Sequence, residues 1–215
     1  MTQKHTERYD LYGKLKDTII FSNKKILDFG GSFGNLIESS NGEILSTDYT
    51  CVDVDKIAIA EGKKNFPDAT WLCYNRYNTM YNPNGDDVWP ELGRYDLIFS
   101  YSVFSHSSYE DLISTIKYFK TILTNDGEIF ISYPSQTNSK LVDWLTKKRI
   151  NDYGSCDTIV PNSTYIYLKD NKIINTIPDK SNYFFTLYND DFIKKLGEVV
   201  VIENFPQHFL KITKK

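Results

Sequence analysis

Lys25-Ile26-Leu27-Asp28-Phe29-Gly30-Gly31-Ser32-Phe33-Gly34-Asn35 is the stretch of sequence that decides the fold. Ile26 and Leu27 are apolar, as expected at the end of a short buried parallel strand. An acidic residue and three glycines within five positions follow. Glycine adopts positive φ and lets a ligand lie close to the backbone, and a helix after the turn would present free N–H groups to that ligand. The stretch therefore predicts a strand, a turn that binds a ligand, and a helix.

The spacing of the glycines separates two kinds of nucleotide-binding turn. The dinucleotide fingerprint is G-x-G-x-x-G. Counting from Gly30 places Ser32 and Asn35 at the later glycine positions, and counting from Gly31 gives no better match. The pattern is instead D-x-G-x-S-x-G, which resembles motif I of the class I S-adenosylmethionine (SAM) methyltransferases. The resemblance implies SAM binding by Asp28, Gly30, Gly31, Ser32 and Gly34, whereas an ordinary strand-to-helix turn is the alternative.

Length, charge and cysteine content limit the class of protein. A chain of 215 residues favours one domain, and a net charge of −3 argues against a nucleic-acid-binding surface. The three cysteines form no C-x-x-C pair, and no His, Asp and Glu cluster implies a metal. The polar N-terminus lacks a secretory signal, and no apolar run approaches the ~20 residues of a membrane span. We expect a cytoplasmic protein whose partner is a small molecule, while the sequence leaves its oligomeric state open.

Two further strands are predicted to end beside the same ligand. Residues 50–54 form a second apolar run, and Asp53 lies nineteen residues beyond Gly34. A carboxylate at this place accepts ribose hydroxyls in nucleotide-binding folds. Asp55 is instead expected to cap a helix over residues 56–64. The resemblance adds Val54 to the cofactor-binding set, and it makes Asn75, after a third strand over residues 70–75, the partner of the adenine amine.

The most apolar strand is predicted over residues 95–103, followed by Phe104-Ser105-His106 and a helix. Ser107-x-x-Glu110 has the spacing of a capping box for that helix. A turn over residues 125–127 then leads to a strand over residues 128–133. This order resembles motifs IV to VI of the class I methyltransferases, and the resemblance covers residues 24–133. It also adds Ser100 to the cofactor-binding set.

The remaining chain completes the expected architecture. A helix is predicted over residues 5–22, in which Tyr9 and Tyr12 either pack on the sheet or close over a ligand. Residues 134–187, with a hairpin formed by 164–168 and 172–177, are expected to be an insertion that shapes a substrate pocket or acts only as a stabilising flap. Strands over residues 199–202 and 209–212 form an antiparallel pair. The resemblance implies an α/β, Rossmann-like single domain over residues 1–215, with a mostly parallel seven-stranded sheet, a C-terminal antiparallel hairpin and helices on both faces.

The favoured function is SAM-dependent methyl transfer to an oxygen or nitrogen of a small molecule. His106 is the candidate general base, because its unperturbed pKa is near 6.5, but a capping or packing role is the alternative. Tyr101 is the second catalytic candidate, as a residue that lines the pocket, although strand alternation also suits a core position. A SAM-binding module or partner subunit without catalysis stays open. An NAD-dependent oxidoreductase is disfavoured by the glycine spacing and the terminal hairpin.

Overall fold

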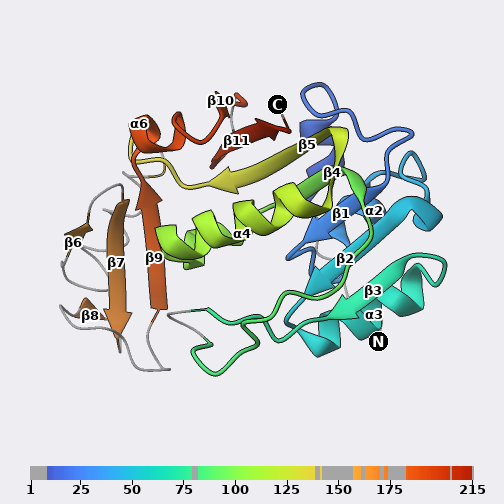
Figure 1. Cartoon of the computed structure of the whole chain (residues 1–215), viewed down its shortest axis with the longest axis horizontal. Coiled ribbons are helices and arrows are strands. Elements are labelled where there is room, and N and C mark those ends of the chain that lie inside the picture. The colour runs from blue at the N-terminus through green and yellow to red at the C-terminus, as the bar shows by residue number, and fades with distance from the viewer. Residues whose placement is uncertain are drawn as a thin grey trace, which may run out of the picture.

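The computed structural model describes residues 9–78, 82–138, 141, 157–160, 163–169, 172–173, 183–203 and 205–214. Its main feature is a seven-stranded sheet with the strand order β10-β11-β5-β4-β1-β2-β3 (Figure 1). The strands are β1 (Ile26–Phe29), β2 (Tyr49–Asp53), β3 (Thr70–Cys73), β4 (Tyr95–Ser100), β5 (Leu123–Tyr133), β10 (Glu198–Val200) and β11 (His208–Thr213).

Strand pairing confirms the predicted topology. β1 pairs in parallel with β2 and β4, and β3 and β5 extend the parallel set on either side. β11 is antiparallel to both β5 and β10, as expected of the C-terminal hairpin. The strand order reverses between β1 and β4, since the chain first adds β2 and β3 on one side of β1. A reversal of this kind leaves a crevice at the carboxyl ends of the two strands, where ligands bind in open α/β sheets.

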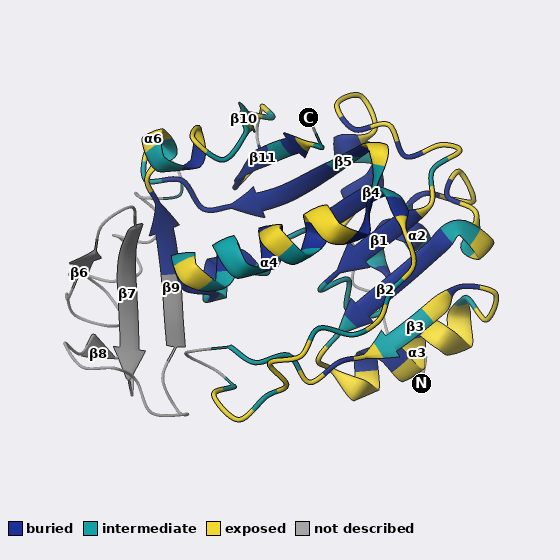
Figure 2. Ribbon diagram, viewed as in Figure 1, coloured by how far each residue is buried: buried dark blue, intermediate teal, exposed yellow. Residues whose placement is uncertain are grey.

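Helices cover both faces of the sheet, as predicted. Leu27 and Ile98 belong to a core that includes residues of α4, whereas Ile26 and Leu97 belong to a second core with residues of α1, α2 and α3. Both faces of β1 and β4 are therefore buried, which explains their continuous apolar runs (Figure 2). The helices are α1 (Leu11–Leu15), α2 (Asn35–Ser39), α3 (Lys56–Asn65), α4 (Tyr109–Ile122) and α6 (Asp190–Ile193), with 3₁₀ turns η1 (Ser46–Asp48) and η2 (Phe104–His106).

The N-terminal helix is shorter than the predicted span of residues 5–22. α1 covers Leu11–Leu15, and residues 1–8 lie outside the described residues. The Asp10 carboxylate caps it by accepting the Gly13 N–H at 2.8 Å. Gly13 and the β-branched run at residues 18–20 have low helix propensity, which accounts for the early end. Tyr12 is buried and donates its hydroxyl to Glu43 at 2.7 Å, so it packs in the core and is not a lid.

The predicted capping box lies one residue too early. The N-cap of α4 is Ser108, whose hydroxyl accepts the Asp111 N–H at 3.1 Å while the Asp111 carboxylate accepts the Ser108 N–H at 3.3 Å. The sequence offers two boxes of equal spacing, Ser107 with Glu110 and Ser108 with Asp111.

The predicted turn at residues 125–127 is also not a separate element. β5 starts at Leu123, directly after α4. Leu123 pairs with Tyr95 and Glu128 pairs with Leu97, so the intervening residues of β5 form a bulge.

The region predicted to be an insertion contains a second, antiparallel sheet. Its strands are β6 (Asp157–Val160), β7 (Ser163–Lys169), β8 (Lys172–Ile173) and β9 (Tyr183–Tyr188). β7 pairs with β8 as the predicted hairpin, and β9 pairs with the other edge of β7. β9 lies beside the first turns of α4 (Figure 1). It is also hydrogen-bonded to the segment that follows β5, where the Tyr188 N–H donates to Pro134 O at 2.8 Å.

Candidate active site

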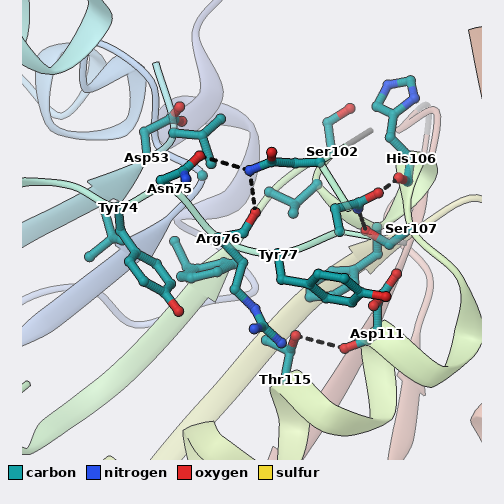
Figure 3. Close-up of a pocket in the computed structure, with 18 of the residues that line it drawn as sticks. Asp53, Tyr74, Asn75, Arg76, Tyr77, Ser102, His106, Ser107, Asp111 and Thr115 are labelled. Carbon is teal, nitrogen blue, oxygen red and sulfur yellow. Dashed lines mark hydrogen bonds between the residues drawn. The ribbon is translucent and has the colours of Figure 1, made fainter. Parts of the chain in front are cut away.

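A cavity of about 810 Å³ lies at the carboxyl ends of β1, β2, β3 and β4. Its volume falls within the roughly 300–1,000 Å³ of small-molecule sites. Asp53 and Asn75 lie at one end, and Asp111 and Thr115 lie at the other (Figure 3). The lining residues are Phe29, Gly30, Val52, Asp53, Val54, Tyr74, Asn75, Arg76, Tyr77, Asn78, Asn82, Tyr101, Ser102, Val103, Phe104, His106, Ser107, Asp111 and Thr115.

The turn after β1 has the positive φ values that its glycines allow. Gly30 has φ +77° and Gly34 has φ +89°, and Ser32 between them has φ +53°. A Cβ at Gly30 would lie 2.1 Å from Val103 Cγ2, so this glycine lets the turn pack against the chain after β4. Ser32 donates its N–H to Asp53 Oδ2 at 2.8 Å, which ties the turn to the end of β2. The left-handed conformation explains why glycine suits position 32.

Asp53 is placed to bind two further donors. Its Oδ2 accepts the Ser32 N–H, and its Oδ1 accepts the Asp55 N–H at 2.8 Å. Each carboxylate oxygen has two acceptor sites, so one on each oxygen remains for a ligand hydroxyl. Asp55 instead accepts the N–H groups of Ile57 and Ala58, which confirms its predicted role as the N-cap of α3.

Asn75 is held by the loop that follows β3. Its Oδ1 accepts from Asn82 Nδ2 at 2.8 Å, and Asn82 Nδ2 also donates to Arg76 O at 2.9 Å. The Arg76 guanidinium lies over the Trp89 ring at 3.9 Å from the ring centre. These contacts fix one wall of the cavity, which Asn75 lines together with Asp53 and Val54.

Five residues of the predicted cofactor set are not among the residues that line the cavity: Asp28, Gly31, Ser32, Gly34 and Ser100. Asp28 is buried beneath the turn, where it accepts the Tyr49 hydroxyl at 2.5 Å. Burial raises the pKa of Asp28 to about 7, although the hydrogen bond from Tyr49 opposes this rise. A Cβ at Gly31 would lie 2.6 Å from the Asp28 carboxyl group, so Gly31 and Asp28 support the turn from within the core.

Ser100 also lies apart from the cavity lining. It is fully buried at the end of β4, and among the described residues its hydroxyl has no hydrogen-bond partner. The cavity is lined instead by the three residues that follow, Tyr101, Ser102 and Val103.

His106, the predicted general base, lines the cavity from η2. Its backbone carbonyl accepts from Asn78 Nδ2 at 3.2 Å, which joins η2 to the loop after β3. In Figure 3 its imidazole ring points away from the end of the cavity formed by Asp111 and Thr115.

Tyr101 lines the cavity and also packs in an aromatic cluster. Its ring is parallel to that of Tyr9, with centres 6.3 Å apart, and meets Phe205 edge-on at 5.4 Å. Burial, and then the proximity of Tyr9, raise the pKa of Tyr101. Its phenol therefore stays protonated near neutral pH, so Tyr101 can donate a hydrogen bond but does not serve as a general base.

Sequence reasoning missed part of the cavity, namely Ser102, Arg76, Tyr77, Asn78, Asp111 and Thr115. Asp111 and Thr115 lie one turn apart on α4, and Thr115 donates its hydroxyl to Asp111 O at 2.7 Å. Their spacing of four at the start of the helix after β4 is the signal that places both on one side of the helix.

Within the described ranges, no group of three His, Cys, Asp or Glu side chains is arranged to hold a metal ion. No described helix is both long and apolar enough to cross a membrane.

Comparison with known proteins identifies the domain. Residues 27–129 match the family described as "Methyltransferase domain". No curated protein matches the chain. A SAM-dependent methyltransferase from Clostridium acetobutylicum is 14% identical, with 93% of this chain and 89% of that chain covered and a TM-score of 0.52.

Two further solved structures share the fold. Magnesium protoporphyrin IX methyltransferase from Synechocystis, with bound S-adenosylhomocysteine (SAH), is 12% identical, covering 93% of this chain and 78% of that chain with a TM-score of 0.52. A glycopeptide N-methyltransferase complexed with sinefungin is 10% identical, covering 98% and 97% with a TM-score of 0.57. The matched domain, the reversed strand order and the cavity at the reversal show that this chain has the Rossmann-like fold of the class I SAM-dependent methyltransferases.

Proposed function

We propose that the protein transfers the methyl group of SAM to an oxygen or nitrogen of a small molecule that binds in the same cavity. The observation that carries the proposal is the continuity of the cavity, which runs from Asp53 and Asn75 to Asp111 and Thr115. One end has the groups that a nucleoside needs, and the other is left for an acceptor. Similar structures are named for methylating a metalloporphyrin and a glycopeptide, which supports a variable acceptor end.

The residues at the first end fit the cofactor. Asp53 has one acceptor site on each oxygen for the two ribose hydroxyls. Val54 and Asn75 line the same cavity, where Val54 would offer apolar contact and Asn75 a hydrogen bond to the edge of the adenine ring. Gly30 brings the backbone to the cavity wall without a side chain, so the methionine part can approach the carboxyl ends of β1 and β4.

The chemistry requires little of the protein beyond positioning. SAM supplies a methyl group already activated by its sulfonium centre. The chain holds the donor and the acceptor in line and excludes water, and aromatic side chains such as Tyr74, Tyr77 and Phe104 line the space for this purpose. A neutral amine needs no base for the transfer itself, whereas a hydroxyl acceptor must lose its proton.

His106 is the proposed base for that proton, and in this role its imidazole, which points away from Asp111 and Thr115 in Figure 3, would have to turn toward the acceptor. If it does, His106→Ala lowers kcat by ~10²–10⁴-fold and removes the acidic limb of the pH–rate profile. The Asn78 bond to residue 106 uses the backbone carbonyl, so the substitution leaves that bond in place. A near-normal kcat with an unchanged profile would show that the enzyme works by positioning alone.

The function is tested by titration calorimetry with SAM, followed by incubation with methyl-labelled SAM and a pool of small molecules from a cell extract. We expect SAM binding and label transfer to a low-mass product. Asp53→Ala should weaken binding by at least 100-fold, since two charged hydrogen bonds of roughly 1.5–3 kcal/mol each are lost.

Asp55→Ala is the matched control. It removes only the cap of α3, so it should lower stability by about 1 kcal/mol and leave SAM affinity almost unchanged. Equal losses of affinity in the two variants would contradict the assignment of Asp53. SAM binding without any labelled product would favour the non-catalytic binding module.

A further inference from the structure

Ser102 has an unusual backbone conformation at the wall of the cavity. Its φ is +61°, and the other described residues with positive φ are glycines, asparagines and Ser32. Serine seldom adopts this conformation unless its surroundings impose it, and such residues cluster at functional sites.

A closed ring of three hydrogen bonds imposes it. The Ser102 N–H donates to Ser132 Oγ at 2.7 Å, the Ser132 hydroxyl donates to Gln207 Oε1 at 2.7 Å, and Gln207 Nε2 donates to Ser102 Oγ at 3.2 Å. Ser132 on β5 is fully buried, and Gln207, just before β11, is 7% exposed. The ring thus joins β5 and the chain before β11 to the residue that follows β4.

The ring has one direction that satisfies all its members. A backbone N–H only donates, so Ser132 Oγ is an acceptor there. The buried Ser132 proton then needs an acceptor, which the amide oxygen of Gln207 supplies. The Gln207 nitrogen, which only donates, is left facing Ser102. Ser102 Oγ must accept from it, and the Ser102 proton must point elsewhere.

Among the described residues, the Ser102 hydroxyl has one hydrogen bond, which it accepts from Gln207. That bond does not use the Ser102 proton, so no described residue accepts it. Ser102 lines the cavity, and a bound molecule is therefore the available partner. We infer that Ser102 is a hydrogen-bond donor to the ligand, and that Gln207 is the positioning residue that sets the direction of this donor. The group recognised is an acceptor such as a carboxylate or carbonyl oxygen, carried by the methionine part of SAM or by the methyl acceptor. The inference rests on the proposed function.

Ser102→Gly separates recognition from folding. It relieves the strain at φ +61° but removes the acceptor of the Gln207 amide, so these opposing effects should leave the thermal midpoint nearly unchanged. Affinity for the molecule that Ser102 contacts should fall about 10- to 100-fold if the group is charged. Asn23→Gly, at another positive φ of +56° and outside the cavity lining, is the control and should leave affinity unchanged.

Gln207→Glu tests the direction of the ring. A carboxylate accepts from both serines, so the Ser102 hydroxyl would turn to residue 207 and present a lone pair to the cavity. We expect the same loss of affinity as in Ser102→Gly, with no further loss when the two changes are combined. A purely structural role for Gln207 would instead give additive losses in the double variant.

Two arms distinguish the source of the recognised group. If the cofactor carboxylate is the partner, calorimetry shows that Ser102→Gly loses affinity for SAM and SAH. Its affinity for 5′-methylthioadenosine, which has no carboxylate, stays unchanged. A raised KM for the acceptor identified by label transfer, with unchanged SAM and SAH affinity, indicates that the methyl acceptor carries the recognised group. Wild-type protein that fails to bind SAM overturns the proposed function. Wild-type binding with the same SAM and SAH affinity and the same label transfer in Ser102→Gly overturns only this inference.

Discussion

Ser32 shows how one residue of the turn after β1 departs from what its backbone favours. The family resemblance places a glycine there, and φ +53° gives the reason. A left-handed conformation costs a non-glycine residue roughly 1–2 kcal/mol, while glycine costs roughly 0.5–1 kcal/mol in lost chain entropy. The first effect is larger, so the serine is a net cost to stability.

We expect Ser32→Gly to raise the free energy of unfolding by roughly 0.5–1 kcal/mol, or about 1–4 °C in Tm. SAM affinity should be retained, because the bond from residue 32 to Asp53 uses the backbone N–H. Gly31→Ala, one position earlier, should do the opposite, since its Cβ would lie 2.6 Å from the Asp28 carboxyl group. Thermal melts of both variants measure this, and a lower Tm for Ser32→Gly contradicts the account.

Asp28 makes stability depend on pH. Its folded-state pKa of about 7 exceeds the ordinary value of 3.8, mainly because of burial. The folded state therefore holds a proton that the unfolded state has lost between these values, and this contribution to stability is lost as pH rises through 7. At about 1.4 kcal/mol per pH unit, the effect is on the order of a few kcal/mol.

Asp28→Asn should remove this dependence. Its stability relative to wild type should increase from pH 5 to pH 8, as measured by urea denaturation at each pH. The comparison must be with wild type, because burial lowers the pKa of His208 and gives a contribution of opposite sign. A difference between the two proteins that stays constant with pH would show that Asp28 titrates normally.

At the scale of elements, periodicity identified most strands but not the contacts between them. α3 lies within one residue of its predicted bounds, and β2 and β4 lie within or next to theirs. The predicted N-cap of α4 was wrong by one residue because two capping boxes overlap in the sequence, and the structure has the one that begins at Ser108. The location of Asp28 and Ser100 could not be predicted either, since a strand pattern does not say which face a ligand meets.

β9 has a role at the site that its own sequence does not show. The buried Tyr188 hydroxyl lies 3.1 Å from Phe104 O and 3.0 Å from Ser107 O, and Thr186 donates to Ser107 O at 2.7 Å. Phe104 begins η2 and Ser107 follows its last residue, so these carbonyls flank the segment that carries His106. β9 thus supports one wall of the cavity, consistent with the proposal that residues 134–187 shape the acceptor end.

Tyr188→Phe should therefore lower stability by roughly 1–3 kcal/mol, because buried carbonyls lose their donor. Methyl transfer should fall while SAM affinity changes little, since the SAM groups lie at the other end of the cavity. Tyr118→Phe is the control, as its hydroxyl donates to Pro90 O at 2.7 Å away from η2. Urea denaturation and calorimetry measure both effects, and a large loss of SAM affinity in Tyr188→Phe would contradict the division of the cavity.

At the scale of the whole molecule, the sequence predicted the mostly parallel sheet because its strands depend on local patterns in residues 24–133, whereas the cofactor end stays a prediction. It did not predict the ring around Ser102. Ser132 and Gln207 are 30 and 105 positions away from Ser102, and neither belongs to a recognised motif. Contacts of this range follow from the pairing of β11 with β5, which brings the C-terminal chain to the cavity.

SAM should consequently stabilise the molecule as one unit, because its site joins four strands of the sheet. At 100 times its Kd, a ligand that binds only the folded state adds about 2.7 kcal/mol, or roughly 5–11 °C in Tm for a chain of this size. NAD at the same concentration should give no shift, since the turn lacks the G-x-G-x-x-G spacing that a pyrophosphate requires. Differential scanning fluorimetry with each ligand compares them directly. Asp53→Ala should abolish the SAM shift, and an NAD shift as large as that of SAM would mean that the turn binds dinucleotides.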